Sequence, residues 1–193
     1  MNSMRQEQRE QRREEILRAA LRLFVRKGYA GTKVGDIAEA VGMSAGLMFH
    51  YFESKEALYE ELIDLGVKGP MGMVDDRFEG DAIAFFEEAA TSILAFLHED
   101  PLMADMFVFM GNAFMDDAIP PRAKDLLAGL DVNTPTVEII RRGQREGTIR
   151  PGDPMALSIA FWAAIQGIAE ELAVYSDMPN PEPEWIVDIV RKR

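Results

Sequence analysis

Apolar residues recur at three- and four-residue spacing along most of the chain, and almost no segment alternates polar and apolar residues as a strand would. This spacing places apolar side chains on one face of an α-helix. We therefore expect an all-α protein. Besides two short helices within 32–52, the pattern predicts helices over residues 5–27, 55–67, 81–98, 101–115, 121–147 with an interruption near 133–135, 154–175, and from 184 onward.

The first short helix is predicted to open at Thr32, whose hydroxyl can accept a hydrogen bond from a backbone N–H in the first turn. Ile37, Ala38 and Val41 then form an apolar face. Gly42 follows, and glycine can adopt the left-handed conformation that a tight helix exit requires. The chain is expected to turn there.

A second short helix is predicted to start at Ser44, which can cap it, and to turn Met48 and Phe52 inward because they are four residues apart. Two short helices joined by a glycine turn have the layout of a helix-turn-helix, which reads DNA with the first residues of its second helix. The same layout also occurs in helical proteins that do not bind DNA. The residues left on the other faces of the second helix are Ala45, Gly46, Phe49 and His50.

The segment also resembles the N-terminal domain of the TetR family of bacterial repressors. The resemblance covers about a quarter of the chain without gaps, and its residues are Gly28-Tyr29, Thr32, Asp36-Ile37-Ala38, Val41-Gly42, Ser44, Gly46, Phe49-His50-Tyr51-Phe52 and Ser54 to Leu58. It implies contacts with DNA phosphates for Thr32, Lys33, Tyr51 and Lys55, which carry hydroxyl or ammonium donors. It implies base contacts for Ser44, Ala45, Gly46 and Phe49.

The chain departs from the commoner family pattern at two positions, with Phe49 in place of a tyrosine and Leu47 in place of a hydroxyl or amide residue. Phenylalanine can pack on a thymine methyl group but cannot donate a hydrogen bond. His50 and Lys33 are therefore the candidates for the missing polar contacts. The alternatives are structural: a surface role for His50, a half-buried wedge for Tyr51, and a solvated lysine capping a charge pair for Lys55.

Residues 5–27 carry an apolar stripe of Leu17, Ala20, Leu21 and Phe24, and Gly28 is expected to end this helix. Residues 5–13 are polar on every face. They are expected to be a frayed terminus or an arm that meets the DNA backbone.

Charge divides the chain into two parts. Residues 1–55 hold ten Lys or Arg against seven Asp or Glu, whereas residues 56–193 hold eleven against twenty-six, which together give the net charge of -12. We expect a DNA-binding domain over residues 1–54 and a helical domain for effector binding and dimerisation over 55–193. Because the first part is only mildly basic, DNA binding should be sensitive to salt.

Composition excludes several kinds of site. The chain has no cysteine and only two histidines, His50 and His98, so neither a thiolate nor a histidine-rich metal site is expected, and no cofactor is implied. We find no catalytic motif, which argues against an enzyme. A continuous run of about 18 apolar residues is absent and the N-terminus is charged, so neither a membrane span nor a secretory signal is expected. These features favour the cytoplasm.

The middle helices are rich in methionine and phenylalanine, and in 101–115 these residues spread over more than one helix face. Such stripes usually form a core, but methionine adapts well to an irregular cavity. TetR-family bodies enclose a pocket for a small effector, so the resemblance implies one here. The predicted lining residues are Phe86, Met103, Met106, Phe107, Met110, Phe114, Trp162 and Gln166.

The segment 154–175 has both a small-residue face, on which Gly167 would let another helix approach, and a bulky face. In the family, the last two long helices pair with their copies to form a four-helix interface. The alternative is that the last helix is an internal lid. The residues predicted for a homodimer interface are Phe161, Ala164, Ile168, Trp185 and Ile189.

Together with these observations, the resemblance implies a dimeric repressor that binds a palindromic double-stranded operator and leaves it when a small hydrophobic effector binds. The alternative is a helical small-molecule-binding protein or enzyme that retains a DNA-binding head. A nonspecific architectural DNA protein is a weaker alternative, because such a protein is usually basic.

Overall fold

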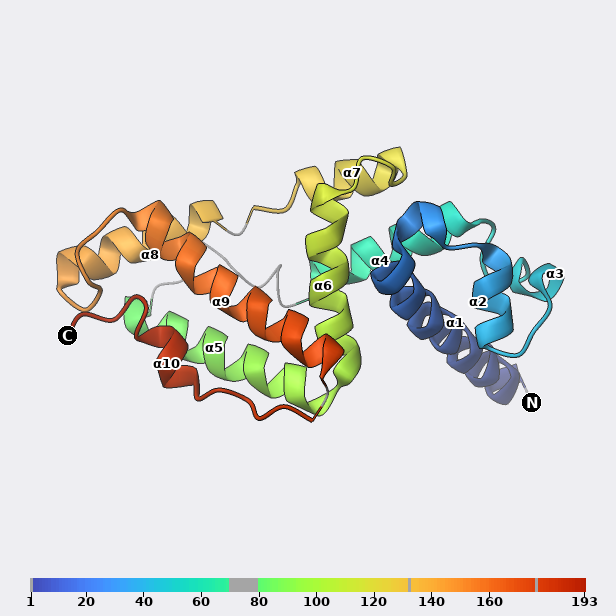
Figure 1. Cartoon of the computed structure of the whole chain (residues 1–193), viewed down its shortest axis with the longest axis horizontal. Helices are drawn as coiled ribbons and strands as arrows, with labels where there is room; N and C mark the ends of the chain where they lie inside the picture. Colours follow the sequence, from blue (N-terminus) through green and yellow to red (C-terminus); the bar gives the residue numbers. More distant parts are fainter. Residues whose placement is uncertain (1, 70–79, 132, 176) are drawn as a thin grey trace. The chain divides into compact units, whose positions relative to one another are not determined.

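The computed structural model describes residues 2–69, 80–131, 133–175 and 177–193. Within these ranges the protein is helical and holds no β-strand, apart from one isolated bridge between Ile149 and Arg191, so the predicted all-α fold is confirmed (Figure 1). The helices are α1 (Asn2–Gly31), α2 (Val34–Ala40), α3 (Ala45–Met48), α4 (Lys55–Lys68), α5 (Ala82–Glu99), α6 (Pro101–Met115), α7 (Pro121–Ala128), α8 (Asn133–Glu146), α9 (Pro154–Val174) and α10 (Pro183–Val187).

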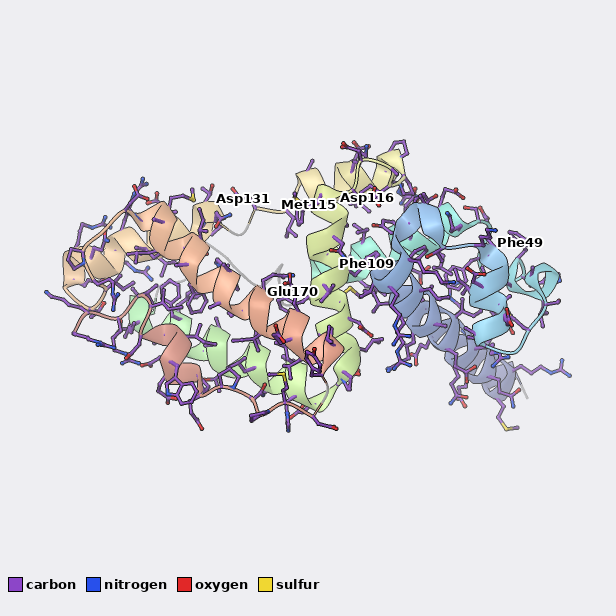
Figure 2. All side chains as sticks on the ribbon, viewed as in Figure 1. Phe49, Phe109, Met115, Asp116, Asp131 and Glu170 are labelled. Atoms are coloured by element: carbon purple, nitrogen blue, oxygen red, sulfur yellow. The ribbon has the colours of Figure 1, made fainter. Side chains whose placement is uncertain are left out.

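The chain forms two compact units. Unit 1 comprises Met1–Gly66 and Phe109–Ala128, and unit 2 comprises Val67–Val108 and Gly129–Arg193. This division differs from the predicted boundary after residue 54, because α4 and the end of α6 pack with the N-terminal helices. The Tyr59 ring of α4 lies 4.9 Å from the rings of both Phe24 and Phe109, the latter labelled in Figure 2.

In unit 1, the inward face of α1 is formed by Ile16, Ala20, Leu21 and Phe24, each at most 2% exposed. The predicted stripe is therefore confirmed for Ala20, Leu21 and Phe24. Gly28 has a φ of +69°, which interrupts the regular helix where the sequence predicted its end. Only glycine adopts this conformation without strain.

In unit 2, α5, α8, α9 and α10 pack around a shared apolar core (Figure 1). Phe86 of α5 and Phe161 of α9 are fully buried at its centre, and their rings meet edge to face at a centroid distance of 4.8 Å. Such aromatic pairs bury a large apolar area and prefer this geometry. They hold the two long helices together.

The apolar character of α9 bears on the expectation that the chain has no membrane span. Its 21 residues are long and apolar enough to cross a membrane, with a mean hydropathy of 1.4 over an 18-residue window. One such helix is weak evidence for a span, since the core helix of a soluble protein passes the same test. Phe161, Ile165, Ala169 and Leu172 do line the core of unit 2, yet only 28% of the window is buried. The large apolar residues of α9 that stay exposed are Met155, Ile159 and Val174.

Candidate nucleic-acid interface

The start of α2 differs from the prediction. The residue that precedes the helix is Lys33, which provides no side-chain cap, and the expected capping role of Thr32 is wrong. The Thr32 hydroxyl donates to the Gly28 carbonyl at 2.8 Å, and its backbone N–H donates to the Tyr29 carbonyl at 3.3 Å. Thr32 is only 1% exposed. Both of its donors are therefore used to close the end of α1, and its predicted phosphate contact has no support from its position.

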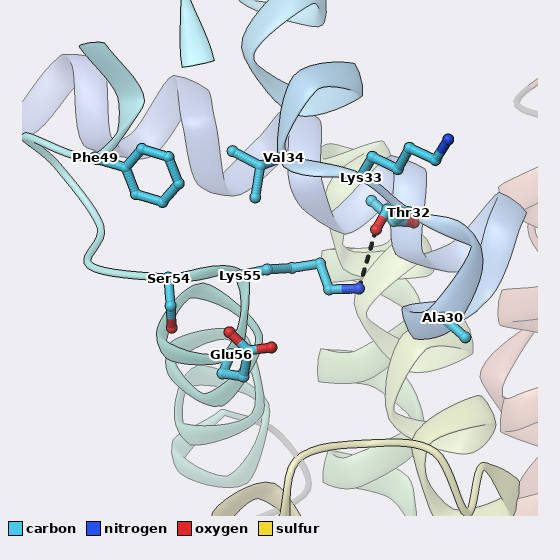
Figure 3. Close-up of a pocket in the computed structure, with 8 residues that line it drawn as sticks. All are labelled: Ala30, Thr32, Lys33, Val34, Phe49, Ser54, Lys55 and Glu56. Atoms are coloured by element: carbon cyan, nitrogen blue, oxygen red, sulfur yellow. Dashed lines mark hydrogen bonds between the residues drawn. The ribbon is translucent and has the colours of Figure 1, made fainter. Parts of the chain in front are cut away.

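Lys55, the first residue of α4, has a similar internal role. Its ammonium group donates to the Thr32 carbonyl at 3.0 Å (Figure 3). It also donates to the Tyr29 carbonyl at 2.8 Å and lies 4.0 Å from the centre of the Tyr29 ring. A lysine that binds the last carbonyls of a helix stabilises its C-terminal end. Lys55 thus joins α4 to the end of α1, which is neither of the two roles considered for it from the sequence.

Next to Lys55, the Tyr29 hydroxyl donates to a Glu56 carboxylate oxygen at 2.7 Å. This hydrogen bond lowers the pKa of Glu56 because it stabilises the charged carboxylate. Burial, followed by the hydrogen bond to Glu56, raises the pKa of Tyr29. Tyr29 therefore stays protonated and keeps its donor role at physiological pH.

The turn and the second helix follow the prediction closely. Gly42 has a φ of +65°, and the Ser44 hydroxyl oxygen accepts from the Leu47 backbone N–H at 3.2 Å. Met48 is fully buried and Phe52 is 4% exposed. The glycine turn, the capping residue and the two inward side chains are confirmed, but the second helix ends at Met48 and the predicted continuation to Phe52 is a turn.

The residues predicted to read bases lie on the outer surface of α3 and the turn after it. Ser44, Ala45, Gly46 and His50 are exposed, and Phe49, labelled in Figure 2, has 51% of its surface exposed. A Cβ atom added at Gly46 would meet no described atom within 4 Å. The start of α3 therefore offers an open surface that a flat or grooved partner can approach closely.

Phe49 borders a hollow of about 430 Å³ on this surface. Figure 3 shows its ring beside Val34, with Lys33 and Lys55 on neighbouring segments. The Lys33 side chain is exposed, whereas Tyr51 and Lys55 are half-buried. Of the four residues predicted to bind phosphate, Lys33 is the one whose charge lies openly at this surface.

Two arginines of α1 were missed by the sequence analysis, which expected residues 5–13 to be frayed or to form an arm. Arg13 donates to the Tyr51 carbonyl at 2.7 Å and to both carboxylate oxygens of Glu61 at 2.7 and 2.6 Å, and lies 4.4 Å from the centre of the Phe52 ring. Arg12 donates to the Val41 carbonyl at 2.8 Å. These bonds attach α1 to the helix-turn-helix, so the expectation is wrong for this part of the segment. A signal was present, because Arg13 continues the buried face of α1 at helical spacing.

Replacing Arg13 by alanine is expected to lower the free energy of unfolding by about 2 kcal/mol. The substitution removes the bidentate, charge-assisted hydrogen bonds to Glu61 and leaves the partly buried Tyr51 carbonyl without its partner. Chemical denaturation measures this change. Arg9→Ala is the matched control, since Arg9 lies one turn earlier on an exposed surface and its loss should change stability by less than about 0.5 kcal/mol. Equal effects of the two substitutions would contradict the assigned role of Arg13.

The eight predicted effector-pocket residues do not lie in one unit. Met110 and Phe114 belong to unit 1, where Met110 is fully buried against Gly66 and Phe114 borders a separate hollow of about 200 Å³. The other six belong to unit 2, and two of these have polar partners. Trp162 donates from its indole nitrogen to the Thr136 hydroxyl at 3.1 Å. The Gln166 amide donates to Glu170 at 3.1 Å and to the Phe107 carbonyl at 3.4 Å.

One of the five residues predicted for the dimer interface is placed elsewhere by the fold, and the exposed Trp185 remains available to an interface. Phe161 is fully buried within its own subunit and cannot contact a second one, whereas Trp185 is 68% exposed. Ala164, Ile168 and Ile189 are partly buried against the core of unit 2. The large apolar residues of α9 that are exposed are Met155, Ile159 and Val174.

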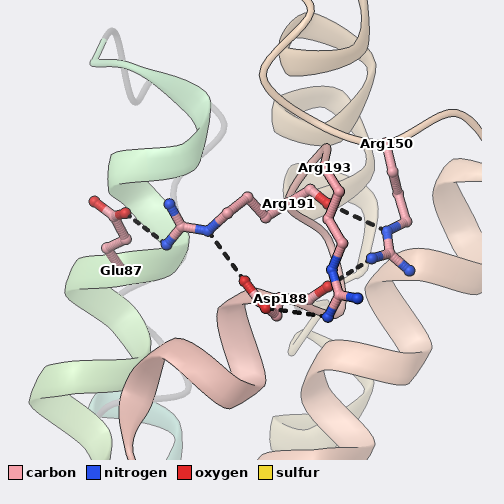
Figure 4. Close-up of polar contacts among 5 residues, drawn as sticks. All are labelled: Glu87, Arg150, Asp188, Arg191 and Arg193. Carbon is pink, nitrogen blue, oxygen red and sulfur yellow. Dashed lines mark hydrogen bonds and ion pairs between the residues drawn. The ribbon is translucent and has the colours of Figure 1, made fainter.

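The predicted long final helix is also corrected. The helix α10 has only five residues, and Ile186, Val187 and Val190 are buried in the core of unit 2. The segment after it is held by Arg191, which binds Glu87 of α5 at 2.9 Å and Asp188 at 3.3 Å (Figure 4). The end of the chain thus matches the alternative of an internal lid. With α10 this short, the last two long helices are α8 and α9.

Among the described residues, no group of three or more His, Asp or Glu side chains is arranged to hold a metal ion. The surface of α2 and α3 carries carboxylates, such as Asp36 paired with Lys27, together with exposed hydroxyl, imidazole and ammonium groups on Ser44, His50 and Lys33. Hydroxyl, imidazole and ammonium groups bind phosphate oxygens and base edges.

Comparisons with known proteins bear on this surface and on the whole fold. Residues 16–62 match the family model described as bacterial regulatory proteins, tetR family. The chain is 39% identical over 67 residues to the HTH-type transcriptional repressor KstR2 of Rhodococcus jostii, a match that covers 35% of the chain and 29% of that protein. It is 28% identical over 163 residues to the HTH-type transcriptional regulator RutR of Escherichia coli K12, covering 82% of the chain and 74% of that protein.

The fold of the whole chain resembles that of a solved regulator. The crystal structure of AibR in complex with isovaleryl coenzyme A and operator DNA superposes with a TM-score of 0.67 at 18% identity, covering 92% of this chain and 94% of that one. The likeness therefore extends through both units, beyond the segment matched by the family model.

Proposed function

We infer that the chain belongs to the TetR family of bacterial regulatory proteins, whose family model matches residues 16–62, and we propose that it acts as a dimeric repressor that leaves a palindromic operator when a small hydrophobic molecule binds. The observation that carries the proposal is the exposed outer surface of α3, held in place by the Ser44 cap and by buried Met48. A capped helix with an open outer face, preceded by a glycine turn, is the element with which such proteins enter the major groove.

The surroundings of α3 support the same role. Arg13 fixes the backbone just after α3 through the Tyr51 carbonyl, and Lys55 fixes the segment just before α2. Lys33 presents an exposed ammonium group at the start of α2, where it can neutralise a phosphate. A rigid reading helix with a nearby cation suits sequence-specific DNA binding.

Dimerisation is supported by the exposed apolar face of α9, which carries Met155, Ile159 and Val174. We propose that this face, rather than Phe161 or α10, pairs with its copy. A two-fold dimer places two reading helices about one turn of DNA apart and matches a palindromic operator. The proposed interface thereby makes the distance between the two reading helices depend on how the two copies of α9 pack.

Effector binding is assigned to unit 2. AibR was crystallised with isovaleryl coenzyme A, so a related fold accommodates an acyl thioester. In this chain the half-buried Met103 and Met106 offer adaptable apolar contacts, and the amide of Gln166 offers a polar anchor. An effector that favours a dimer geometry unsuited to the operator weakens DNA binding, and the operator weakens effector binding by the same factor.

The proposal places the protein in the cytoplasm, where its DNA partner is, and gives it a regulatory rather than a catalytic role. Members of the family are soluble DNA-binding regulators. The exposed apolar part of α9 is then explained by a second subunit and needs no lipid.

Selection from a pool of random duplex DNA at about 0.15 M salt tests the function. We expect a palindromic consensus. Lys33→Ala should weaken binding to it and reduce the slope of log affinity against log salt by about 1, the value for one lost phosphate contact. Lys192→Ala is the matched control, because this exposed lysine lies in unit 2.

Each outcome has a distinct meaning. Enrichment of a palindrome with a Lys33-specific loss supports the proposal. Equal binding to every duplex would indicate a nonspecific DNA protein, and absence of binding would leave a helical small-molecule-binding protein or enzyme as the better description.

A further inference from the structure

We propose that Leu47 and Phe49 read the 5-methyl groups of thymines, so that the operator carries thymine at the positions that face α3. The inference rests on the proposed function and specifies how the same surface chooses its sequence.

The two side chains are unusual in their exposure. Leu47 and Phe49 flank the fully buried Met48, yet 46% and 51% of their surfaces are exposed. Both are large and apolar, and both lie on or next to a helix of only four residues. The two side chains lie on either side of the buried Met48, so each exposes a separate large apolar surface next to the start of α3, and such exposed apolar groups indicate contact with an apolar partner.

The partner is indicated by the charge around them. The hollow that Phe49 borders is lined by Lys33, Lys55 and the anionic Glu56, and of the two lysines only Lys33 is exposed. Residues 1–55 hold ten cationic against seven anionic residues in a chain whose remainder is strongly acidic. An apolar surface with an exposed cation beside it, in the mildly basic part of the chain, fits apolar groups that are themselves bordered by phosphates. The major groove of DNA offers this arrangement.

Within the major groove, the methyl group on C5 of thymine is the apolar feature of the unmodified base pairs. Neither Leu47 nor Phe49 can exchange hydrogen bonds with a base edge, so neither can recognise guanine, cytosine or adenine through polar groups. Ala45 is small and Gly46 lacks a side chain, and both are exposed, which allows the backbone of α3 to approach closely enough for these contacts.

The polar groups at this surface are few. The Ser44 oxygen already accepts the Leu47 backbone N–H, which leaves its hydroxyl hydrogen as a donor, and His50 is exposed at the end of α3. Methyl contacts therefore supply a large share of the discrimination between bases in each half-site.

The test replaces each thymine of the selected operator, one at a time, by deoxyuridine, which keeps every hydrogen-bonding group and removes only the methyl group. Binding should weaken about fourfold at a thymine that faces α3, the value for burying one methyl-sized group. Thymines outside the half-sites should show no change. For the Leu47→Ala and Phe49→Ala proteins, the ratio of the affinity for the thymine operator to that for the deoxyuridine operator should fall towards one at the contacted positions.

Two controls isolate the methyl group. Leu65→Ala removes a leucine that is also 46% exposed but lies on α4, and it should preserve the full thymine preference. In the DNA, a 5-methylcytosine pair at a contacted position should bind better than the unmethylated cytosine pair, because the methyl group is restored while the hydrogen-bonding pattern stays that of cytosine.

A fourfold preference that disappears with Leu47 or Phe49 supports the inference. A selected operator that binds equally well with deoxyuridine at every position would overturn it and leave the proposed function intact. If no sequence is selected at all, both fail together.

Discussion

Replacing Ile159 by aspartate is expected to dissociate the dimer and to weaken operator binding by about 100-fold or more. Ile159 lies on the exposed apolar face of α9 and is 54% exposed in the single subunit. A carboxylate buried against the copy of this face has no cation to pair with on that face, and burial of an unpaired charge is costly. Loss of the dimer removes the gain that comes from binding two half-sites together, which is typically 100-fold or more.

Sedimentation measures the dissociation, and titration of the operator measures the affinity. Ala95→Asp, which introduces the same charge at an exposed position of α5, is the matched control and should leave the dimer intact. If Ile159→Asp remains dimeric and still binds the operator, the proposed face of α9 is wrong.

Replacing Phe161 by alanine should instead lower the free energy of unfolding by about 3–5 kcal/mol, the usual cost of removing a buried phenylalanine. Phe161 is fully buried, and its ring lies 4.8 Å from that of Phe86 and 5.2 Å from that of Trp162. Its removal leaves a cavity between α5 and α9, because packed helices close such a gap only in part.

Urea denaturation at several protein concentrations distinguishes this effect from loss of an interface. The Phe161→Ala protein should be destabilised by a similar amount at every concentration, whereas a weakened interface gives a loss that grows on dilution. Phe96→Ala removes a phenylalanine of α5 that is 47% exposed. It should lower the free energy of unfolding much less than Phe161→Ala does. A Phe161→Ala protein that keeps its stability but becomes monomeric would return Phe161 to the interface predicted from the sequence.

The two residues show why the interface prediction was only partly correct. Ile159 and Phe161 are two positions apart on one helix, so their side chains point in nearly opposite directions. The sequence of α9 is apolar on both faces, and periodicity alone therefore does not distinguish the face that packs on α5 from the face that remains exposed. The packing of α5 and α8 decided that Phe161 is inside.

The parts of the candidate site that were predicted correctly depend on local interactions. The turn at Gly42 needs a left-handed residue, the cap at Ser44 binds an N–H three residues away, and Met48 of α3 and Phe52 just after it are both buried. Each of these features depends on a few neighbouring residues. The family resemblance of the same segment is likewise carried by a continuous stretch of sequence.

The roles of Lys55 and Arg13 depend on contacts between segments 23–48 positions apart, whereas Thr32 donates to carbonyls three, four and nine positions earlier in the chain. A hydroxyl near a helix start and a lysine near another resemble phosphate ligands in the sequence, but here both satisfy carbonyl groups at the end of α1. The reason is that helix ends leave backbone groups that must find partners when buried. Which partner lies within reach is not a property of the local sequence.

The amino-acid sequence by itself determined that this protein is helical, that residues 32–52 form a helix-turn-helix, and that its outer surface carries Phe49 and His50, because helical periodicity and capping act over a few residues. Only the tertiary structure decided that Arg13 holds this element, that the last helix is a short lid, and that Ile159 rather than Phe161 is exposed. Those outcomes depend on which distant segments pack together, since burial is a property of the folded chain and not of any one segment.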